Sequence, residues 1–243
     1  MINTPSFKLK YGLKLVTFLM LVYAGVTRAQ VIAAIDTQDT LSQRLQACTV
    51  CHGKEGRATN SGYFPRIAGK PADYLYQQLL NFRDGRRTYA AMTHLLELLS
   101  DDYLREIAQH FASLNLPYSA PQSTNASPAV LDRGRALVQQ GDKSRQIPAC
   151  VSCHGVALTG VLPAVPGLLG LPRDYITGQL GAWRNGKRRA NPPDCMHEIA
   201  QRLEADDVSA LAQWLSSQAL PANTAPAAQP RHDASVHCGL SLK

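Results

Sequence analysis

The chain has 243 residues and a formal net charge of +7, from 25 Lys and Arg against 18 Asp and Glu. Four of the basic residues and none of the acidic ones fall within residues 1–29, so the remainder carries only +3. A charge this small gives no support to nucleic-acid binding, and the roughly 214 remaining residues suit one large domain or two small ones.

The N-terminal segment predicts export. Three lysines precede an apolar run over residues 15–26, and small residues occupy positions −3 and −1 of a cleavage site after Ala29. The apolar run is shorter than the roughly 20 residues that span a membrane. We therefore expect a cleaved signal peptide over residues 1–29 and a periplasmic protein, with an uncleaved N-terminal anchor as the alternative.

Two C-x-x-C-H motifs lie about a hundred residues apart in the sequence. In this motif the two thiols add across the haem vinyl groups, and the histidine reaches the iron from one side. Such attachment takes place in an extracytoplasmic compartment, in agreement with export. The sequence thus predicts two covalently bound haem c groups, attached through Cys48, Cys51, Cys150 and Cys153 and ligated by His52 and His154.

The first half of the chain reads as a series of helices. A helical pattern over residues 40–47 runs toward the first motif, and Pro71 suits the first turn of a helix that ends at Gly85. Ser100 can cap a further helix with an apolar stripe on one face. A segment rich in Pro, Ser and Ala follows. We therefore predict an N-terminal domain over residues 30–117 and a linker over residues 118–128.

The second half repeats this plan in the same order, which indicates a duplicated domain. Residues 64–74 match residues 165–175 at a shift of 101, and the match continues through the helix that follows. Residues 141–148 form an extra loop before the second motif. We predict a C-terminal domain over residues 129–219 and a flexible, low-complexity tail over residues 220–243.

Each repeat also contains one methionine beyond its motif. Apart from two methionines in the signal segment, the chain has only Met92 and Met196, which align with each other at a shift of 104. A thioether is a suitable second ligand for haem iron and raises the reduction potential, although methionine also serves as a core filler. We predict Met92 and Met196 as axial ligands, which closes both irons to substrate and favours one-electron transfer. His94, His110 and His197 are interpreted as surface or structural residues.

These motifs together resemble the dihaem cytochrome c4 family. The resemblance covers residues 36–217 and implies an all-α protein of two tandem class I cytochrome c domains, related by an approximate twofold, each wrapped around one haem. It implies that haem propionates face the interdomain contact, where Arg86 and Lys187 are candidates to approach them, although exposed, solvated charge is the expected role of at least one of the two. It also implies that the carbonyls of Pro65 and Pro166 lie against the axial histidines.

The resemblance further implies a periplasmic carrier of single electrons rather than an enzyme. Its expected partners are a donor dehydrogenase or quinol-oxidising complex and a terminal oxidase, with peripheral membrane contact and no nucleic acid. Two alternatives remain open. In the first, the chain is the cytochrome subunit of a flavoprotein or other dehydrogenase complex, for example a sulfide-oxidising one. In the second, it is a dihaem enzyme that oxidises sulfur compounds.

Cys195 and Cys238 are left over from the haem motifs, and Cys195 directly precedes Met196. Cysteines in an oxidising compartment often pair, so a Cys195–Cys238 disulfide is one expectation. Two free thiols or an intermolecular bridge are the others. In the enzymatic alternative, Cys195 supplies a thiolate near the second haem.

Overall fold

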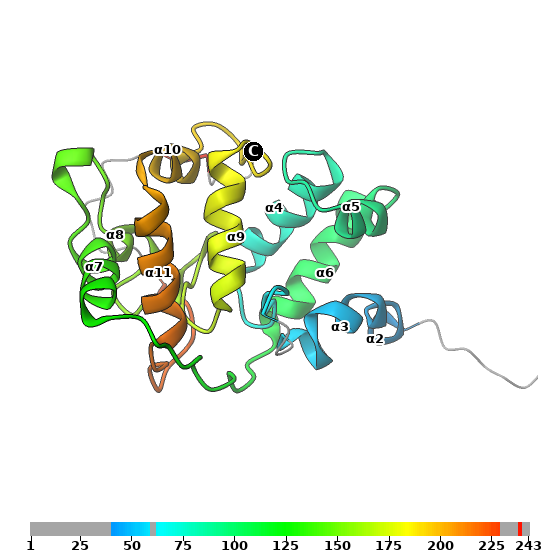
Figure 1. Ribbon diagram of the computed structural model, residues 1–243. Coiled ribbons are helices and arrows are strands. Elements are labelled where there is room, and N and C mark those ends of the chain that lie inside the picture. The colour runs from blue at the N-terminus through cyan, green and yellow to red at the C-terminus, as the bar shows by residue number, and fades with distance from the viewer. Residues whose placement is uncertain (1–39, 59–61, 229–237, 240–243) are drawn as a thin grey trace, which may run out of the picture. The chain divides into compact units, whose positions relative to one another are not determined.

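Residues 40–58, 62–228 and 238–239 are described by the computed structural model, and the chain forms two compact units, residues 1–44 and residues 45–243. The first unit contributes one short described helix, α2 (Leu41–Arg44), and the predicted signal peptide lies outside the described residues. All other described elements belong to the second unit (Figure 1). No helix within the described ranges has the length and apolar character needed to cross a membrane.

The first half of the second unit is helical in its described residues. Its elements are α3 (Gln46–His52), the 3-10 helix η1 (Lys54–Gly56), α4 (Ala72–Arg83), α5 (Ala90–Leu96) and α6 (Asp101–Ser113). As predicted, α4 begins directly after Pro71, and the chain turns at Gly85 with a φ of +74°. The Ser100 hydroxyl caps α6 by accepting a hydrogen bond from the Tyr103 backbone N–H at 3.3 Å.

The second half repeats these helices and adds a small hairpin. Its elements are α7 (Pro128–Gln139), the 3-10 helix η2 (Lys143–Arg145), α8 (Cys150–His154), β1 (Gly160–Val161), β2 (Val165–Pro166), α9 (Arg173–Arg184), α10 (Cys195–Arg202) and α11 (Ala205–Ser217). The strands β1 and β2 pair antiparallel, with Val161 opposite Val165. Residue Ala227, beyond α11, pairs in parallel with Val161. The sequence did not predict the hairpin, because two-residue strands show no alternation.

The extra loop over residues 141–148 is an integral part of the fold. The carboxylate of Asp142 binds Arg133 of α7 at 3.0 Å and Arg145 at 3.1 Å. Both arginines also bind Asp207 of α11, at 2.8 and 2.7 Å. Hydrogen bonds from Ser144 and the two arginines hold the pKa of Asp142 below its usual range. This network fixes the loop to α7 and α11.

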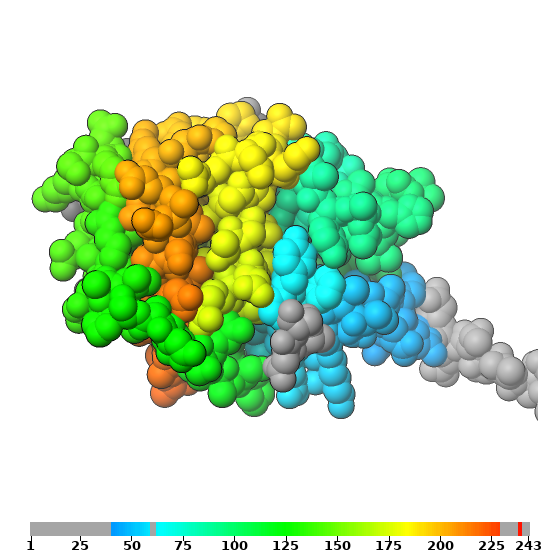
Figure 2. Space-filling model, viewed as in Figure 1, coloured from blue at the N-terminus to red at the C-terminus, as the bar shows by residue number. Residues whose placement is uncertain are grey.

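The core of the second half forms where α11 packs against both α7 and α9. Figure 2 shows α11, in orange, between α7 in green and α9 in yellow. Leu137 and Val138 of α7 are fully buried there, and Leu211 and Leu215 of α11 are 4 % exposed. These residues repeat at the helical spacing that the sequence shows, so the apolar stripe of α11 is core, as predicted.

Helices α7 and α11 approach so closely that only glycine fits at position 134. A Cβ atom added to Gly134 would collide with the carbonyl oxygen of Ala210 and lie 2.7 Å from the Cβ of Trp214. Because one of these neighbours is backbone, the helices would have to separate. We expect Gly134→Ala to lower the free energy of unfolding by about 3 kcal/mol, at the upper end for overpacking. Urea unfolding followed by haem absorbance measures this.

Gly181→Ala is the matched control, since it is the same change within helix α9. A Cβ at Gly181 meets nothing within 4 Å, and the first repeat has Leu80 at the equivalent position. Here the higher helix propensity of alanine should raise stability by up to about 1 kcal/mol. Equal effects of the two substitutions would contradict the close-packing argument.

Candidate haem-binding sites

Each C-x-x-C-H motif forms a short helix that ends at its histidine. Helix α3 ends at His52 and helix α8 at His154, and both side chains are buried. A glycine follows each histidine, with φ of +76° at Gly53 and +83° at Gly155, which reverses the chain directly after the histidine. Because residues three apart share a helix face, the two thiols of each motif lie on one side of the helix.

Equivalent hydrogen bonds orient the two histidines. The Nδ1–H of His52 donates to the carbonyl oxygen of Pro65 at 2.8 Å, and that of His154 donates to the carbonyl of Pro166, also at 2.8 Å. The proline carbonyls therefore lie where the resemblance implied. A proton on Nδ1 leaves the lone pair of Nε2 free for a metal. Burial lowers the pKa of both imidazoles, which keeps them in the neutral form that binds iron.

The four motif cysteines are free, and none is paired with its neighbour in a disulfide. Burial raises the pKa of Cys48 and Cys153 and raises that of Cys150 to about 12. Such apolar surroundings fit uncharged thioether bonds at the edge of a porphyrin, rather than thiolates bound to a metal ion. In the second half, Cys150 and Met196 pack against the same core cluster.

The two methionines occupy equivalent positions on short helices, Met92 on α5 and Met196 on α10. Both side chains are half-buried. The residue after each methionine ties its helix to the preceding one: Thr93 Oγ1 donates to the Phe82 carbonyl at 3.3 Å, and His197 Nδ1 to the Trp183 carbonyl at 3.1 Å. Since Phe82 and Trp183 are equivalent in the repeat, this contact is duplicated. His197 is thus structural, as interpreted, and it positions the methionine segment.

Two buried arginines, Arg87 and Arg188, lie where the two halves meet. Their backbones form an antiparallel bridge, flanked by hydrogen bonds from Thr88 N–H to Lys187 O and from Arg189 N–H to Arg86 O. Each guanidinium stacks on a ring of its own half, Arg87 on Phe82 at 4.4 Å and Arg188 on Trp183 at 3.7 Å. Each also donates to side chains of both halves, and the acceptors are Gln78, Gln179, Tyr175 and Tyr74.

These contacts are reciprocal, because each partner of Arg87 has an equivalent partner of Arg188 in the other repeat. Their acceptors are neutral amides and phenols, and no ion pair between either guanidinium and a carboxylate occurs in the described part of the chain. Burial, together with the neighbouring charge of Arg87, lowers the pKa of Arg188. Two like charges buried side by side need an anion that the described residues do not supply.

The resemblance made Arg86 and Lys187 candidates for the propionates, but their side chains are not the buried ones at this contact. Arg86 is held in its own loop, where it donates to Asn81 at 2.6 Å and to Asp84 at 2.9 Å, and Lys187 is exposed. The next residue in each case, Arg87 or Arg188, is the one whose side chain is buried at the contact between the domains. One signal was available, since Arg87 and Arg188 are identical in the repeat, whereas positions 86 and 187 differ.

No protein-family model matches the chain. The thiosulfate dehydrogenase electron acceptor of Thiomonas intermedia is 37% identical over 175 residues, 72% of this chain and 79% of that protein. Cytochrome c4 of Pseudomonas aeruginosa is 34% identical over 171 residues, 69% of this chain and 82% of its own length.

The chain belongs to the cytochrome c4 family.

Solved structures agree with this assignment. Reduced cytochrome c4 from Pseudomonas stutzeri matches with a TM-score of 0.63 and 30% identity, over 72% of this chain and 95% of that one. Thiosulfate dehydrogenase (TsdBA) from Marichromatium purpuratum matches with a TM-score of 0.65 and 32% identity, over 71% of this chain. This chain spans only 36% of that second protein.

The predicted fold class is thereby confirmed. The chain is an all-α protein of two tandem class I cytochrome c domains, related by an approximate twofold, and it carries two covalently bound haem c groups. It is a dihaem electron carrier. The exact limits of the two domains and the identity of the iron ligands stay predictions.

The two cysteines outside the haem motifs are joined in a disulfide. The sulfur atoms of Cys195 and Cys238 are 2.06 Å apart, and the Gly239 backbone N–H donates to the Pro193 carbonyl at 2.9 Å. The expectation of an intramolecular bond is confirmed, and the alternatives of free thiols or an intermolecular bridge are wrong. The bond fixes a part of the C-terminal tail beside the segment that carries Met196.

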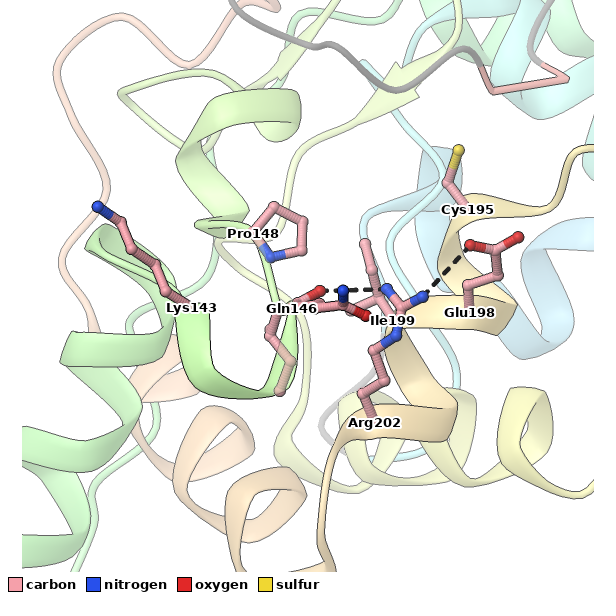
Figure 3. Close-up of a pocket in the computed structure, with 8 residues that line it drawn as sticks. Lys143, Gln146, Pro148, Cys195, Glu198, Ile199 and Arg202 are labelled. Atoms are coloured by element: carbon pink, nitrogen blue, oxygen red, sulfur yellow. Dashed lines mark hydrogen bonds and ion pairs between the residues drawn. The ribbon is translucent and has the colours of Figure 1, made fainter.

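A cavity of about 370 Å³ lies between the extra loop and helix α10 of the second cytochrome c domain (Figure 3). Arg202 crosses it, donating to the Gln146 carbonyl at 3.1 Å and pairing with Glu198 at 3.7 Å. Its charge is therefore engaged within the cavity wall. The remaining lining residues are Lys143, Ile147, Pro148, Cys195 and Ile199.

Proposed function

We propose that the chain holds its two haems through Cys48 and Cys51 in the first domain and Cys150 and Cys153 in the second. The proposed axial pairs are His52 with Met92 and His154 with Met196. The observation that carries the proposal is the duplicated hydrogen bond from Nδ1 of each motif histidine to a proline carbonyl, at 2.8 Å in both repeats. The duplicated anchoring of the two methionine helices supports it.

When bound, each haem supplies a one-electron iron couple between the ferrous and ferric states. Two residues ligating each iron leave no open position, so the protein's residues serve to hold ligands rather than to bind substrate. We propose that Arg87 and Arg188 bind the haem propionates where the domains meet. Two buried guanidinium groups with neutral protein partners support this assignment.

We propose further that the chain accepts electrons from a dehydrogenase and passes them to a terminal oxidase or another acceptor. Relatives at 37% and 35% identity are named as electron acceptors of thiosulfate dehydrogenase, which favours a donor of that kind. An enzyme in which Cys195 provides a thiolate is disfavoured, because its sulfur is bonded to Cys238. A free carrier and a subunit of a dehydrogenase complex share the same proposed ligands.

The export signal supports a location in the periplasm, with cleavage after Ala29. The two C-x-x-C-H motifs support the same location, because haem attachment to them takes place in an extracytoplasmic compartment.

A redox titration monitored by absorption and electron paramagnetic resonance spectra tests the carrier function. We expect two one-electron steps, each from a low-spin haem with methionine and histidine ligands. Adding a thiosulfate dehydrogenase with thiosulfate should reduce both haems, whereas thiosulfate alone should reduce neither. Reduction by thiosulfate alone, or the spectrum of a thiolate-ligated haem, would show that the chain is itself the enzyme.

A further inference from the structure

Lys70 of the first domain is buried against the second domain. Its side chain is 4 % exposed, and its Nζ donates a hydrogen bond to the carbonyl oxygen of Gly167 at 3.2 Å. The residue stands directly before Pro71 and helix α4, whereas Gly167 follows strand β2. The contact therefore carries a charged group of one domain into the interior of the other.

The acceptor of this hydrogen bond is adjacent to the carbonyl that orients the second histidine. Gly167 directly follows Pro166, and Pro166 accepts the Nδ1–H of His154 at 2.8 Å. The Lys70 ammonium thus lies on the histidine side of the proposed second haem site. Its charge acts on His154, where it adds to burial in lowering the imidazole pKa. For His52, the charged residue with this effect is Arg87.

No carboxylate neutralises Lys70 among the described residues. Its other close neighbours are the Tyr118 ring, whose centroid is 6.0 Å from Nζ, and the guanidinium of Arg66. Arg66 is itself buried and donates to the carbonyls of Ala68, Leu116 and Pro117. The charge of Lys70 is therefore not cancelled by a protein anion, and its field extends over a longer distance in this buried region than at the surface.

The repeat does not contain a second copy of this contact. The residue equivalent to Lys70 in the second domain is Leu171, and Arg66 is equivalent to Gly167. The two domains share one fold, but only the first has a lysine at this position, and its ammonium group reaches into the second domain. Differences between the two haem sites then arise from individual charges such as this one.

We infer that Lys70 raises the reduction potential of the second haem, which favours electron transfer from the first haem to the second. The inference rests on the proposed ligation by His154. A ferric haem carries one more positive charge than a ferrous haem, so a fixed cation nearby destabilises the oxidised form. With this charge in place, the second haem holds an electron more firmly than it would without Lys70.

Two variants separate the charge of Lys70 from its packing. Lys70→Gln keeps a donor for the Gly167 carbonyl but removes the charge, whereas Lys70→Arg keeps both. Lys187→Gln, which removes an exposed lysine of the second domain, is the surface control. Redox titrations are run at pH 6, because burial and Arg66 lower the pKa of Lys70 to about 7, so the ammonium predominates there.

We expect Lys70→Gln to lower the equilibrium constant for electron transfer from the first haem to the second about tenfold, which corresponds to ~59 mV for one electron. Lys70→Arg should retain most of the original difference, and Lys187→Gln should change it little. Each titration is repeated in a Met92→Ala background, in which the second haem alone keeps its methionine-ligated spectrum. Unchanged potentials in Lys70→Gln, or an equal shift of both haems, would overturn the inference.

These outcomes are distinct from a failure of the proposed ligation. If Met92→Ala leaves both spectra unaltered, the ligand assignment is wrong. If Met92→Ala alters one spectrum but Lys70→Gln leaves the potentials unchanged, then the ligand assignment stands and the proposed role of Lys70 is wrong.

Discussion

Replacing Met196 with alanine should convert the second haem to a high-spin, open site while the first stays low-spin, and Met92→Ala should do the reverse. Each substitution removes the thioether that we propose as sixth ligand. Because methionine ligation raises the potential, the affected haem should fall by on the order of 0.2 V, a fraction of the ~0.8 V that axial ligands span. Absorption spectra of the ferric protein and a redox titration measure both effects.

Ile199→Ala is the control for a role in packing alone. Ile199 lies on the same helix as Met196, is also half-buried, and packs against the same core cluster. Its truncation should cost about 1–3 kcal/mol of stability and leave the spectra unchanged. If Met196→Ala behaves in the same way as Ile199→Ala, then Met196 is a core filler and the ligand lies elsewhere.

Arg188→Gln should lower the free energy of unfolding of the haem-loaded protein by about 3 kcal/mol, as expected when one partner of a buried ion pair is lost. The substitution also removes the stacking on Trp183 and the hydrogen bonds to Gln78, Gln179 and Tyr74. Thermal or denaturant unfolding followed at the haem absorbance gives the value. Arg87→Gln should have a similar effect, because its contacts are equivalent.

Lys187→Gln is the control for Arg188, since it removes one positive charge from the adjacent exposed residue. It should change stability by less than about 0.5 kcal/mol. A stabilising effect of Arg188→Gln would contradict the propionate proposal. If the two arginines have no anionic partner, then removing one relieves repulsion between buried like charges, and Arg188→Gln would make the protein more stable.

The sequence predicted those parts of the fold that depend on local pattern. Helices α4, α6, α7, α9 and α11 follow from apolar spacing, and Pro71 and Ser100 mark starts that the structure confirms. The proline carbonyls against His52 and His154 followed from the family resemblance, and both hydrogen bonds are present. The helix expected over residues 40–47 does not form as one piece, because a turn at Leu45 separates α2 from α3.

Contacts between the repeats could not be predicted in the same way. Lys70 and Gly167 are 97 residues apart, and Arg87 and Gln179 are 92 apart, so no local period links them. Residues 184–189 include four basic side chains, a composition typical of a solvated surface, yet Arg188 among them is buried. Arg188 is the buried residue of this segment because its backbone pairs with that of Arg87 in the other domain, and this pairing is visible only in the folded structure.

The six cysteines of this chain end in two different chemical states. Cys195 and Cys238 are oxidised to a disulfide, whereas haem attachment requires the four motif cysteines as reduced thiols. In each motif the two thiols are only three residues apart, so an oxidant able to join residues 195 and 238 also acts on them. The complete protein therefore requires an environment that joins the tail cysteines and still leaves both C-x-x-C pairs as thiols for the haems.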